Sequence, residues 1–439
     1  MQEPLQCDVL VIGGGPAGSS ASTMLARKGW QVLQLEKEQH PRFHIGESLL
    51  PCNLPILETL GVLEEIKAIG VLKLGADFPA AKGRYQTFHF RRALGHSPDH
   101  AYQVKREEFD QILFENARAK GVDAREQVCV ESVEVEALGS VRAVARDAEG
   151  NERSIRARYV VDASGRDTVL GKKFQLKRKN AAHQSAAIFA HFKAVERRPD
   201  EDAGNISIYH FDQGWCWFIP LRNGIMSIGC VCWPEYLKQR KGSSEAFLMQ
   251  TLERMPEAWE RMSGARIDGE VRVTGNYSYA CSRMCGPGWI MAGDAWAFVD
   301  PVFSSGVYLA MQSGMAAASL VDACLQDAAA EKPLQRAYVR RIRRGVRFFS
   351  WFILRFNSPT MRSLFANPRN YWRVEEGMVS MLAGDVFDSA PVLRRFHVFK
   401  LIYAVSSLFS WSRGRKERAA RRHQARVEFS GGTTPVDQA

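Results

Sequence analysis

Hydrophobic and polar positions over the first third of the chain follow the order of a βαβ unit. Residues 7–12 and 30–36 have the apolar pattern of buried strands, and residues 17–28 between them have helical spacing. This order predicts a parallel sheet with a right-handed crossover. Helical spacing recurs over 53–69 and 107–120, and acidic residues at the start of the second segment suit a helix N-terminus.

The remaining chain adds further strands and a helical end. Alternation over 127–147 and 155–163 predicts strands, and residues 183–233, rich in β-branched and aromatic side chains, predict an antiparallel sheet. A strand at 288–293 leads into a helix at about 304–325, and roughly the last hundred residues are helical in character, Arg-rich and aromatic. The first and third blocks are therefore expected to form one nucleotide-binding unit, into which the middle block is inserted.

Composition is that of an ordinary globular protein. The chain has 439 residues, 46% of them hydrophobic and 24% charged. No apolar stretch reaches the roughly 18–20 residues of a membrane span. No signal peptide is visible before the first strand, so we expect a cytoplasmic protein. Nine scattered cysteines lack the spacing of a zinc site and are interpreted as reduced thiols, without a metal. The net charge of +11 indicates an acidic partner but does not identify it.

A glycine-rich turn between the first strand and helix is the first motif with a chemical role. Gly13, Gly15 and Gly18 have GxGxxG spacing, and Glu36 closes the second strand. Gly13 permits the turn, Gly15 lets the backbone approach a pyrophosphate, and Gly18 lets helix and strand pack closely. The helix N-terminus favours the pyrophosphate, and Glu36 accepts hydrogen bonds from ribose hydroxyls. These residues predict a dinucleotide site.

Later segments indicate which dinucleotide is bound. Residues 159–166 read YVVDASGR, residues 288–294 read GWIMAGD, and residues 294–306 read DAWAFVDPVFSSG. With the glycine motif, this series resembles the FAD-binding fold of the aromatic hydroxylases and their relatives, which is of the glutathione-reductase-like type. The resemblance spans nearly all of residues 7–320 and implies FAD as the cofactor.

The same resemblance implies individual contacts to the flavin. Asp294 would hydrogen-bond the ribityl or ribose region, and the helix after it would point its N-terminus at the isoalloxazine ring. Arg106, in VKREEFD, matches an Arg at the start of a helix near the flavin. The cofactor-binding residues expected in this way are Gly13, Gly15, Ala17, Gly18, Glu36, Arg42, Glu47, Ser48, Arg106, Asp294, Pro301 and Gly306.

A tryptophan-rich segment points to one branch of these flavoproteins. GWCWFIP at 214–220 satisfies W-x-W-x-I-P through Trp215, Trp217, Ile219 and Pro220. It resembles the motif of the flavin-dependent halogenases, where it lies beside the flavin and has been interpreted as blocking direct access of the substrate. Alternatively, the aromatic residues only fill a sandwich core, and the motif then still marks the family.

Lys73, in VLKLGADF, resembles the lysine segment of the phenol and pyrrole halogenases. The resemblance implies that reduced FAD, oxygen and chloride or bromide yield hypohalous acid, which Lys73 holds and aims at an aromatic ring. An ammonium can hydrogen-bond this acid, and a neutral amine can form a haloamine. A lysine is usually solvated, but the neighbours Val71, Leu72, Leu74 and Phe78 favour the catalytic role.

The loop 300–306 is the third resemblance to the halogenases. There it binds a halide on backbone N–H groups, which by position belong to Ser305 and Gly306. A Gly-containing turn at a helix N-terminus suits an anion, although it could also serve the flavin alone. Tryptophan halogenases carry a Glu in this loop, where this chain has Phe303 and Ser304. We therefore expect a phenol or pyrrole, free or held on an acyl or peptidyl carrier protein, rather than free tryptophan.

The basic end of the chain allows three interpretations. Segment 391–426 holds about ten Lys or Arg residues against one acidic residue. Its helix could pack on the FAD domain with a solvated basic face, dock an acidic carrier protein, or contact a membrane surface as a peripheral anchor. Nucleic-acid binding is disfavoured because no recognition fold accompanies the charge. The tail 427–439 is expected to be disordered.

The predicted fold class is α/β, with a glutathione-reductase-like FAD-binding Rossmann domain, an inserted antiparallel β-sheet substrate domain and a C-terminal helical region. The expected boundaries are 1–80, 106–180 and 276–330 for the FAD-binding domain, 81–105 and 181–275 for the substrate domain, 331–426 for the basic helical region and 427–439 for the tail.

Alternatives to halogenation stay open at this point. The sequence shows no second nucleotide motif, which favours a separate NAD(P)H-dependent flavin reductase as the source of reduced FAD. Related flavoproteins hydroxylate aromatic compounds as monooxygenases or reduce polyenes, as geranylgeranyl reductases do. Both would bind NAD(P)H directly and turn over without halide. A non-catalytic scaffold for a carrier protein is a further alternative.

Overall fold

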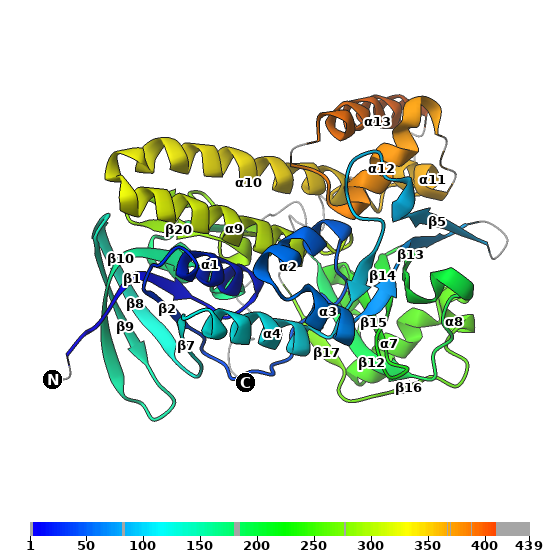
Figure 1. The fold of residues 1–439 in the computed structure, drawn as a ribbon. Helices are drawn as coiled ribbons and strands as arrows, with labels where there is room; N and C mark the ends of the chain where they lie inside the picture. Colours follow the sequence, from blue (N-terminus) through cyan, green and yellow to red (C-terminus); the bar gives the residue numbers. More distant parts are fainter. Residues whose placement is uncertain are drawn as a thin grey trace.

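The computed structural model contains two large β-sheets that lie side by side, with helices around them (Figure 1). The expectations for residues 410–426 and for the tail lie outside the described residues. The structure describes residues 3–80, 84–179, 185–275, 278–366, 368, 370–387 and 389–409.

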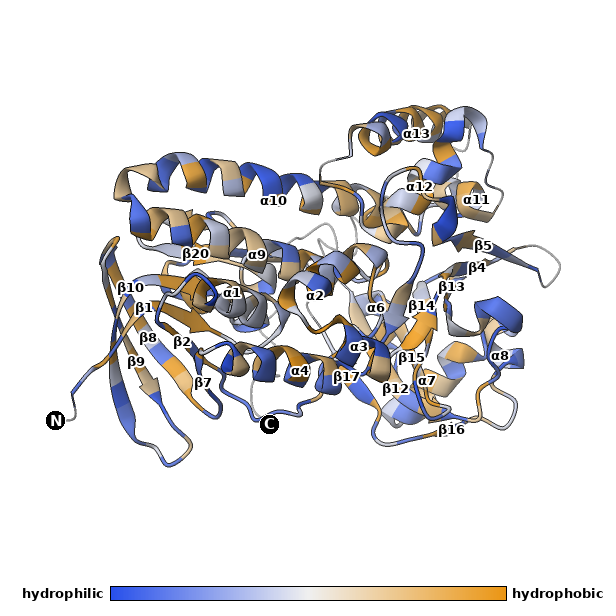
Figure 2. Ribbon diagram, viewed as in Figure 1, coloured by the Kyte–Doolittle hydropathy of each residue, from blue (hydrophilic) through white to orange (hydrophobic). Residues whose placement is uncertain are grey.

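The first sheet has the order β19-β20-β10-β1-β2-β7, and β9 and β8 extend it from β10. β1 pairs in parallel with both β2 and β10, so the predicted βαβ unit is confirmed. Val9 to Ile12 are buried, as expected for a strand covered on both faces, and Figure 2 shows these central strands as hydrophobic. The strands are β1 (Leu5–Ile12), β2 (Val32–Leu35), β7 (Asp123–Arg125), β8 (Cys129–Ala137), β9 (Ser140–Arg146), β10 (Glu152–Asp162), β19 (Cys285–Gly286) and β20 (Trp289–Met291).

Helices α1 and α9 pack against each other on one face of this sheet, and α10 lies on α9 (Figure 1). The helical segment expected at 53–69 is two helices, because Gly61 adopts a left-handed conformation with φ of 79° and ends the first one. The helices are α1 (Pro16–Ala26), α2 (Leu54–Leu60), α3 (Leu63–Ile69), α4 (Arg106–Ala119), α5 (Val169–Lys173), α9 (Ser305–Gln326) and α10 (Glu331–Ile353).

The second sheet has the order β16-β12-β15-β14-β13-β4-β5, and β17 also pairs with β12. β12 to β15 are antiparallel neighbours, as predicted for the middle of the chain. β4 joins this sheet, although it precedes the boundary at residue 80 that the sequence suggests. The strands are β4 (Gly75–Pro79), β5 (Tyr85–His89), β12 (Ala186–Lys193), β13 (Ile206–Phe211), β14 (Gly214–Pro220), β15 (Met226–Cys232), β16 (Arg266–Ile267) and β17 (Arg272–Thr274).

Smaller elements complete the fold. Two short sheets connect the halves, and helices α6 to α8 cover the outer part of the second sheet (Figure 1). These elements are β3 (Val71–Lys73), β6 (Ala101–Gln103), β11 (Lys177–Lys179), β18 (Tyr279–Cys281), β21 (Ala297–Phe298), α6 (Pro234–Lys238), α7 (Ser244–Leu252) and α8 (Pro256–Glu260).

The C-terminal part is helical, as predicted, and comprises α11 (Pro359–Ala366), α12 (Val374–Ala383) and α13 (Ala390–Phe409). Phe396 and Phe399 of α13 are buried against Phe352 of α10. None of the described helices is long and apolar enough to cross a membrane. All nine cysteines are free, in agreement with their interpretation as thiols.

Candidate active site

A cavity of about 520 Å³ lies where the carboxyl ends of β1, β2 and β10 meet the face of the second sheet. In sheets of this type, ligands bind at the carboxyl ends of the strands. Of the predicted site residues, Gly18, Lys73, Ser305 and Pro220 do not line the cavity. Those that do line it are Gly13, Gly15, Ala17, Glu36, Arg42, Glu47, Ser48, Arg106, Trp215, Trp217, Ile219, Asp294, Pro301 and Gly306.

The backbone of the glycine-rich turn is tightly packed at Gly18 and open to the cavity at Gly15. A Cβ atom at Gly18 would lie 2.0 Å from the carbonyl oxygen of Gly13, so only glycine allows α1 to approach β1 this closely. A Cβ atom at Gly15 would meet nothing nearer than the Arg42 guanidinium, at 3.5 Å. The backbone at Gly15 is therefore accessible from the cavity, where a pyrophosphate could lie against the N-terminus of α1.

Glu36 and Arg42 form a charged rim beside this turn. The Glu36 carboxylate accepts hydrogen bonds from the backbone N–H groups of Gly14 at 2.7 Å and Glu38 at 3.0 Å. Arg42 lies 3.5 Å from Glu36 and 3.4 Å from the carboxylate of Asp110. Backbone and side-chain contacts thus fix the Glu36 carboxylate where a ribose hydroxyl could donate to it.

Asp110 holds Arg106 in place and was not identified from the sequence. Burial acts to raise the pKa of Asp110, but the Arg106 guanidinium outweighs it, so the pKa lies below its ordinary value. Arg106 donates two hydrogen bonds to Asp110, at 2.8 and 2.9 Å, and a third to the carbonyl of Ile45 at 2.9 Å. In the sequence, only the i,i+4 spacing of Arg106 and Asp110 on the predicted helix could have indicated this ion pair.

Asp294 presents an unsatisfied carboxylate to the cavity. It follows β20, and its side chain forms no hydrogen bond with any described residue. Burial raises the pKa of Asp294 to about 6, although Arg106 and Arg166 act to lower it. A desolvated acceptor at this place fits the hydroxyl groups of a ribityl or ribose chain, so the cavity is matched to a flavin dinucleotide in its donors and acceptors.

Strand β14 forms one wall of the cavity through alternate side chains. Trp215, Trp217 and Ile219 face the cavity, and Cys216 and Phe218 point into the core of the second sheet. This follows from the two-residue period of a strand. The Trp217 indole N–H donates to the Ser227 hydroxyl at 3.2 Å, which fixes the ring. Pro220 belongs to the motif but is not a lining residue.

Lys73 is buried directly behind the cavity wall. Its side chain is 2% exposed, and Nζ donates to the Ser48 hydroxyl at 3.0 Å and to the Leu49 carbonyl at 2.9 Å. The Phe90 ring centroid lies 5.3 Å from Nζ. Burial lowers the pKa of Lys73 to about 7. Because Ser48 lines the cavity, Lys73 is separated from it by a single hydrogen-bonded side chain.

The loop 300–306 meets the cavity at the N-terminus of α9. Ser304 adopts a left-handed conformation with φ of 55°, and α9 begins at Ser305. The Ser305 hydroxyl is buried and has no hydrogen-bond partner among the described residues. A Cβ atom at Gly306 would meet nothing within 4 Å, so this backbone is open to the cavity. Phe303 is buried against Phe352, Phe356 and Phe365.

Sequence reasoning also missed His191, which contributes to the site from β12. Its Nε2 lies 2.8 Å from one carboxylate oxygen of Glu47, and the other oxygen of Glu47 is buried without a partner. The pair joins the segment that carries Ser48 to the second sheet. No local pattern links residues so far apart in the chain, so only the fold reveals this contact.

Comparisons with known proteins agree with this geometry. The FAD binding domain family matches residues 6–350. A tryptophan 2-halogenase of Chondromyces crocatus is 35% identical over 347 residues, which are 77% of this chain and 66% of that protein. A flavin-dependent halogenase of Armillaria mellea is 34% identical over 355 residues, 75% of this chain and 70% of that protein. The chain belongs to the FAD-dependent halogenases. Their cofactor, FAD, is the group to which the cavity is matched.

Other relatives match over most of their length. A 1H-pyrrole-2-carbonyl-[peptidyl-carrier protein] chlorinase of Pseudomonas fluorescens is 29% identical over 427 residues, 91% of this chain and 94% of that protein. Among solved structures, the myxobacterial chondrochloren halogenase CndH has a TM-score of 0.76 at 32% identity and covers 90% of this chain. The flavin-dependent brominase Bmp2 has a TM-score of 0.79 at 28% identity and also covers 90%. The first curated relative is longer, and the chain spans 66% of its length.

Proposed function

We propose that the chain halogenates an electron-rich aromatic ring, using reduced FAD, oxygen and chloride or bromide, and that Lys73 holds the hypohalous acid. The observation that supports this role is a fully buried lysine that has no carboxylate partner among the described residues and lies one hydrogen bond behind the flavin cavity. Because its pKa is about 7, both the ammonium and the neutral amine form of Lys73 are populated at neutral pH. When bound, reduced FAD supplies the activation of oxygen that halide oxidation needs.

Different residues of the cavity would bind different parts of FAD. The N-terminus of α1, at Gly13 to Gly15, would bind the pyrophosphate, and Glu36 the adenosine ribose. Asp294 would accept from the ribityl chain. Arg106, fixed by Asp110, would lie along the cofactor, and the lining residues Ala17, Arg42, Glu47 and Pro301 would complete the contacts.

Ser305 and Gly306 would bind the halide through their backbone N–H groups. Both lie in the first turn of α9, where N–H groups lack helical acceptors and the helix dipole favours an anion. The buried hydroxyl of Ser305 supplies a further donor that no described residue uses. The wall of Trp215, Trp217 and Ile219 would keep the organic substrate from reaching the flavin directly.

The substrate would be a phenol or pyrrole. Phe303 lies in an aromatic cluster at the position where tryptophan halogenases place a Glu, so no carboxylate is available there to orient free tryptophan. A relative that covers 91% of this chain acts, by its name, on a pyrrole carried by a peptidyl carrier protein. We therefore propose a carrier-bound aromatic acyl group as the substrate and a separate flavin reductase as the source of reduced FAD.

Turnover with and without halide tests this function. The chain, supplied with FAD, a flavin reductase, NADH and oxygen, is incubated with free phenol and pyrrole probes, and products are analysed by mass spectrometry. We expect halogenated products only when bromide or chloride is present. Hydroxylated products, reduced polyenes or direct NAD(P)H oxidation that is indifferent to halide would contradict the proposal.

A further inference from the structure

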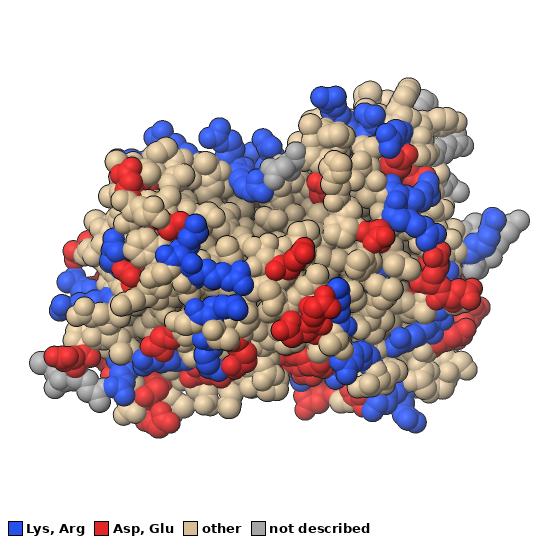
Figure 3. All heavy atoms as spheres, in the orientation of Figure 1, with Lys and Arg blue, Asp and Glu red and all other residues tan. Residues whose placement is uncertain are grey.

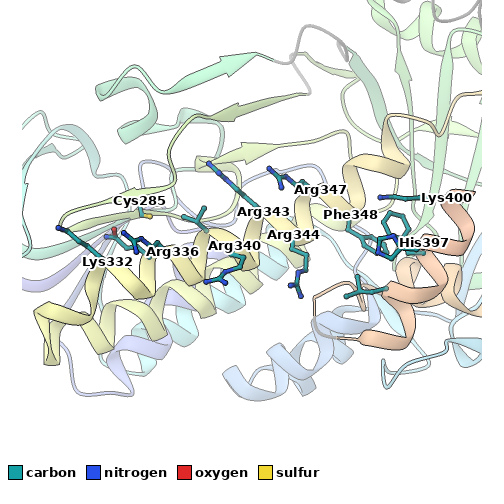
Figure 4. Close-up of a pocket in the computed structure, with 14 residues that line it drawn as sticks. Cys285, Lys332, Arg336, Arg340, Arg343, Arg344, Arg347, Phe348, His397 and Lys400 are labelled. Carbon is teal, nitrogen blue, oxygen red and sulfur yellow. The ribbon is translucent and has the colours of Figure 1, made fainter. Parts of the chain in front are cut away.

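A basic groove runs along α10 and ends at α13 (Figure 4). It encloses about 900 Å³ and has no acidic residue in its lining. Figure 3 shows Lys and Arg side chains gathered along this edge of the molecule, over α10. Its cations are Lys332, Arg336, Arg340, Arg343, Arg344, Arg347 and Lys400.

No carboxylate of the described residues pairs with these cations. Within the ranges that the structure describes, none of the seven groove cations forms a salt bridge, whereas exposed arginines elsewhere, such as Arg142 and Arg146, pair with glutamates. Lys332, Arg336, Arg340, Arg343 and Arg347 recur every three or four residues, on one face of α10. Like charges at this spacing destabilise a helix. The row therefore carries an electrostatic cost that an anionic partner would offset.

The shape of the groove limits the class of partner. From Lys332 to Arg347 the row extends over about 22 Å of helix, which is longer than a free phosphate or a single nucleotide needs. The cations surround a hollow, so a flat bilayer would contact its edges rather than its lining. The exposed apolar residues Leu401, Val405 and Leu408 of α13, which a bilayer would need, are not among the lining residues. An acidic helix of about the same length matches both the charge and the shape.

We infer that this groove docks the acidic face of a carrier protein that brings the aromatic substrate as a thioester. The inference rests on the proposed function and adds the surface that its carrier-bound substrate would use. Charge complementarity of this kind sets the rate and the register of protein association. The carrier-protein chlorinase of Pseudomonas fluorescens matches 91% of this chain.

The position of α10 links the groove to the site. Ile342 and Val346 of α10 line a small cavity that Asp294 and Gly306 also line. Helix α10 therefore borders both the basic groove and this small cavity beside Asp294. At the α13 end, the rings of Phe348 and Phe396 are tilted against each other with centroids 3.9 Å apart.

Binding of a carrier protein to charge-reversal variants tests the inference. The probe is the fluorescently labelled peptidyl carrier protein that holds pyrrole-2-carbonyl in Pseudomonas fluorescens, titrated with the full-length, FAD-loaded chain. R336E/R340E reverses two exposed groove cations that make no hydrogen bond within the described residues, and K120E/K241E makes the same change of charge elsewhere on the surface. We expect R336E/R340E to raise Kd about tenfold or more and K120E/K241E to change it less than about twofold. Affinity of the wild-type chain should fall as salt is raised.

Three outcomes would overturn the inference. In the first, the wild-type chain does not bind the carrier. In the second, R336E/R340E binds the carrier as tightly as the wild-type chain does. In the third, R336E/R340E and K120E/K241E lose the same amount of affinity for the carrier. Vesicles containing phosphatidylglycerol are tested in parallel. If R336E/R340E loses sedimentation with these vesicles but keeps its affinity for the carrier, the groove is a membrane contact.

Halogenation of a free pyrrole probe separates this inference from the proposed function. We expect the wild-type chain and both double variants to halogenate the probe at equal rates, because neither pair of substitutions touches the cavity. If the wild-type chain halogenates neither this free probe nor pyrrole-2-carbonyl held on the carrier protein, the proposed function fails. The binding data then still decide whether the groove docks the carrier.

Discussion

At the scale of single residues, Lys73 is the group whose environment departs furthest from that of an ordinary lysine. Lys67, a surface lysine, pairs with Glu64 at 2.6 Å. Lys73 has a hydroxyl and a carbonyl as acceptors and no carboxylate, so burial dominates and lowers its pKa to about 7. Keeping an amine desolvated beside a cavity is costly, and such sites are candidates for chemistry.

The pH dependence of halogenation follows from this pKa. The proposed active form is the ammonium, which donates a hydrogen bond to hypohalous acid and polarises its halogen. Because the pKa of Lys73 is about 7, the ammonium is lost as pH rises through neutrality. We expect the rate with a free phenol probe to fall about a hundredfold from pH 6 to pH 9. Flavin reoxidation, measured in parallel, controls for effects on the cofactor. A rate that is flat or rises with pH would contradict the ammonium role.

A second prediction at this scale concerns the stability that Asp110 contributes through Arg106. Removal of its carboxylate in Asp110→Ala leaves Arg106 buried without a counter-charge, which typically costs about 3–5 kcal/mol. Asp123→Ala breaks the exposed pair with Arg125 and should cost less than about 1 kcal/mol. Urea unfolding of the two variants measures both free energies. Equal, small changes would show that Asp110 does not support Arg106 in the way described.

At the scale of elements, three features position the site: the glycine turn before α1, the alternating face of β14 and the N-terminus of α9. Each of them places backbone or side chains at one cavity, although they are far apart in the chain. The closest fit is between α1 and β1, where Gly18 lies against the carbonyl of Gly13. This contact can be tested without touching any residue that lines the cavity.

Gly18→Ala should destabilise the protein through overpacking. Its added methyl group would lie 2.0 Å from the Gly13 carbonyl oxygen and would force α1 away from β1. We expect a cost of about 1–3 kcal/mol and loss of bound FAD. Gly275→Ala is the control, because its nearest new contact would be 3.9 Å away. Thermal unfolding and the flavin absorbance of the purified variants measure both effects, and equal behaviour of the two variants would refute the packing argument.

The sequence predicted the elements well where local patterns determine them. The βαβ start, α4, the antiparallel middle and α9 were confirmed within a few residues. The break at Gly61 was missed, because one glycine in a helical pattern does not reveal a left-handed backbone. The contacts of Asp110 and His191 required the tertiary fold. The two-residue period of a strand shows that alternate side chains share a face, but not which face is turned toward the cavity. The sequence therefore did not reveal that Pro220 lies off the cavity wall.

At the scale of the whole molecule, the proposed chemistry and the proposed partner contact lie at different places. The flavin cavity and the basic groove along α10 are lined by different residues of the described part of the chain. The net charge of +11 is therefore not spread evenly, and part of it forms one long surface. This arrangement would let the proposed carrier protein bind without contacting the residues that would hold FAD.

The most direct test of the account is Lys73→Met, compared with the wild-type chain in the presence of excess free methionine, which consumes any hypohalous acid that escapes. The variant should fold, bind FAD and consume oxygen normally, since methionine fills the same buried space. We expect its halogenation of a phenol or pyrrole probe to fall by about a hundredfold or more, the usual contribution of a positioned proton donor. Halogenation at the wild-type rate by this variant would contradict the central claim that Lys73 holds the oxidant.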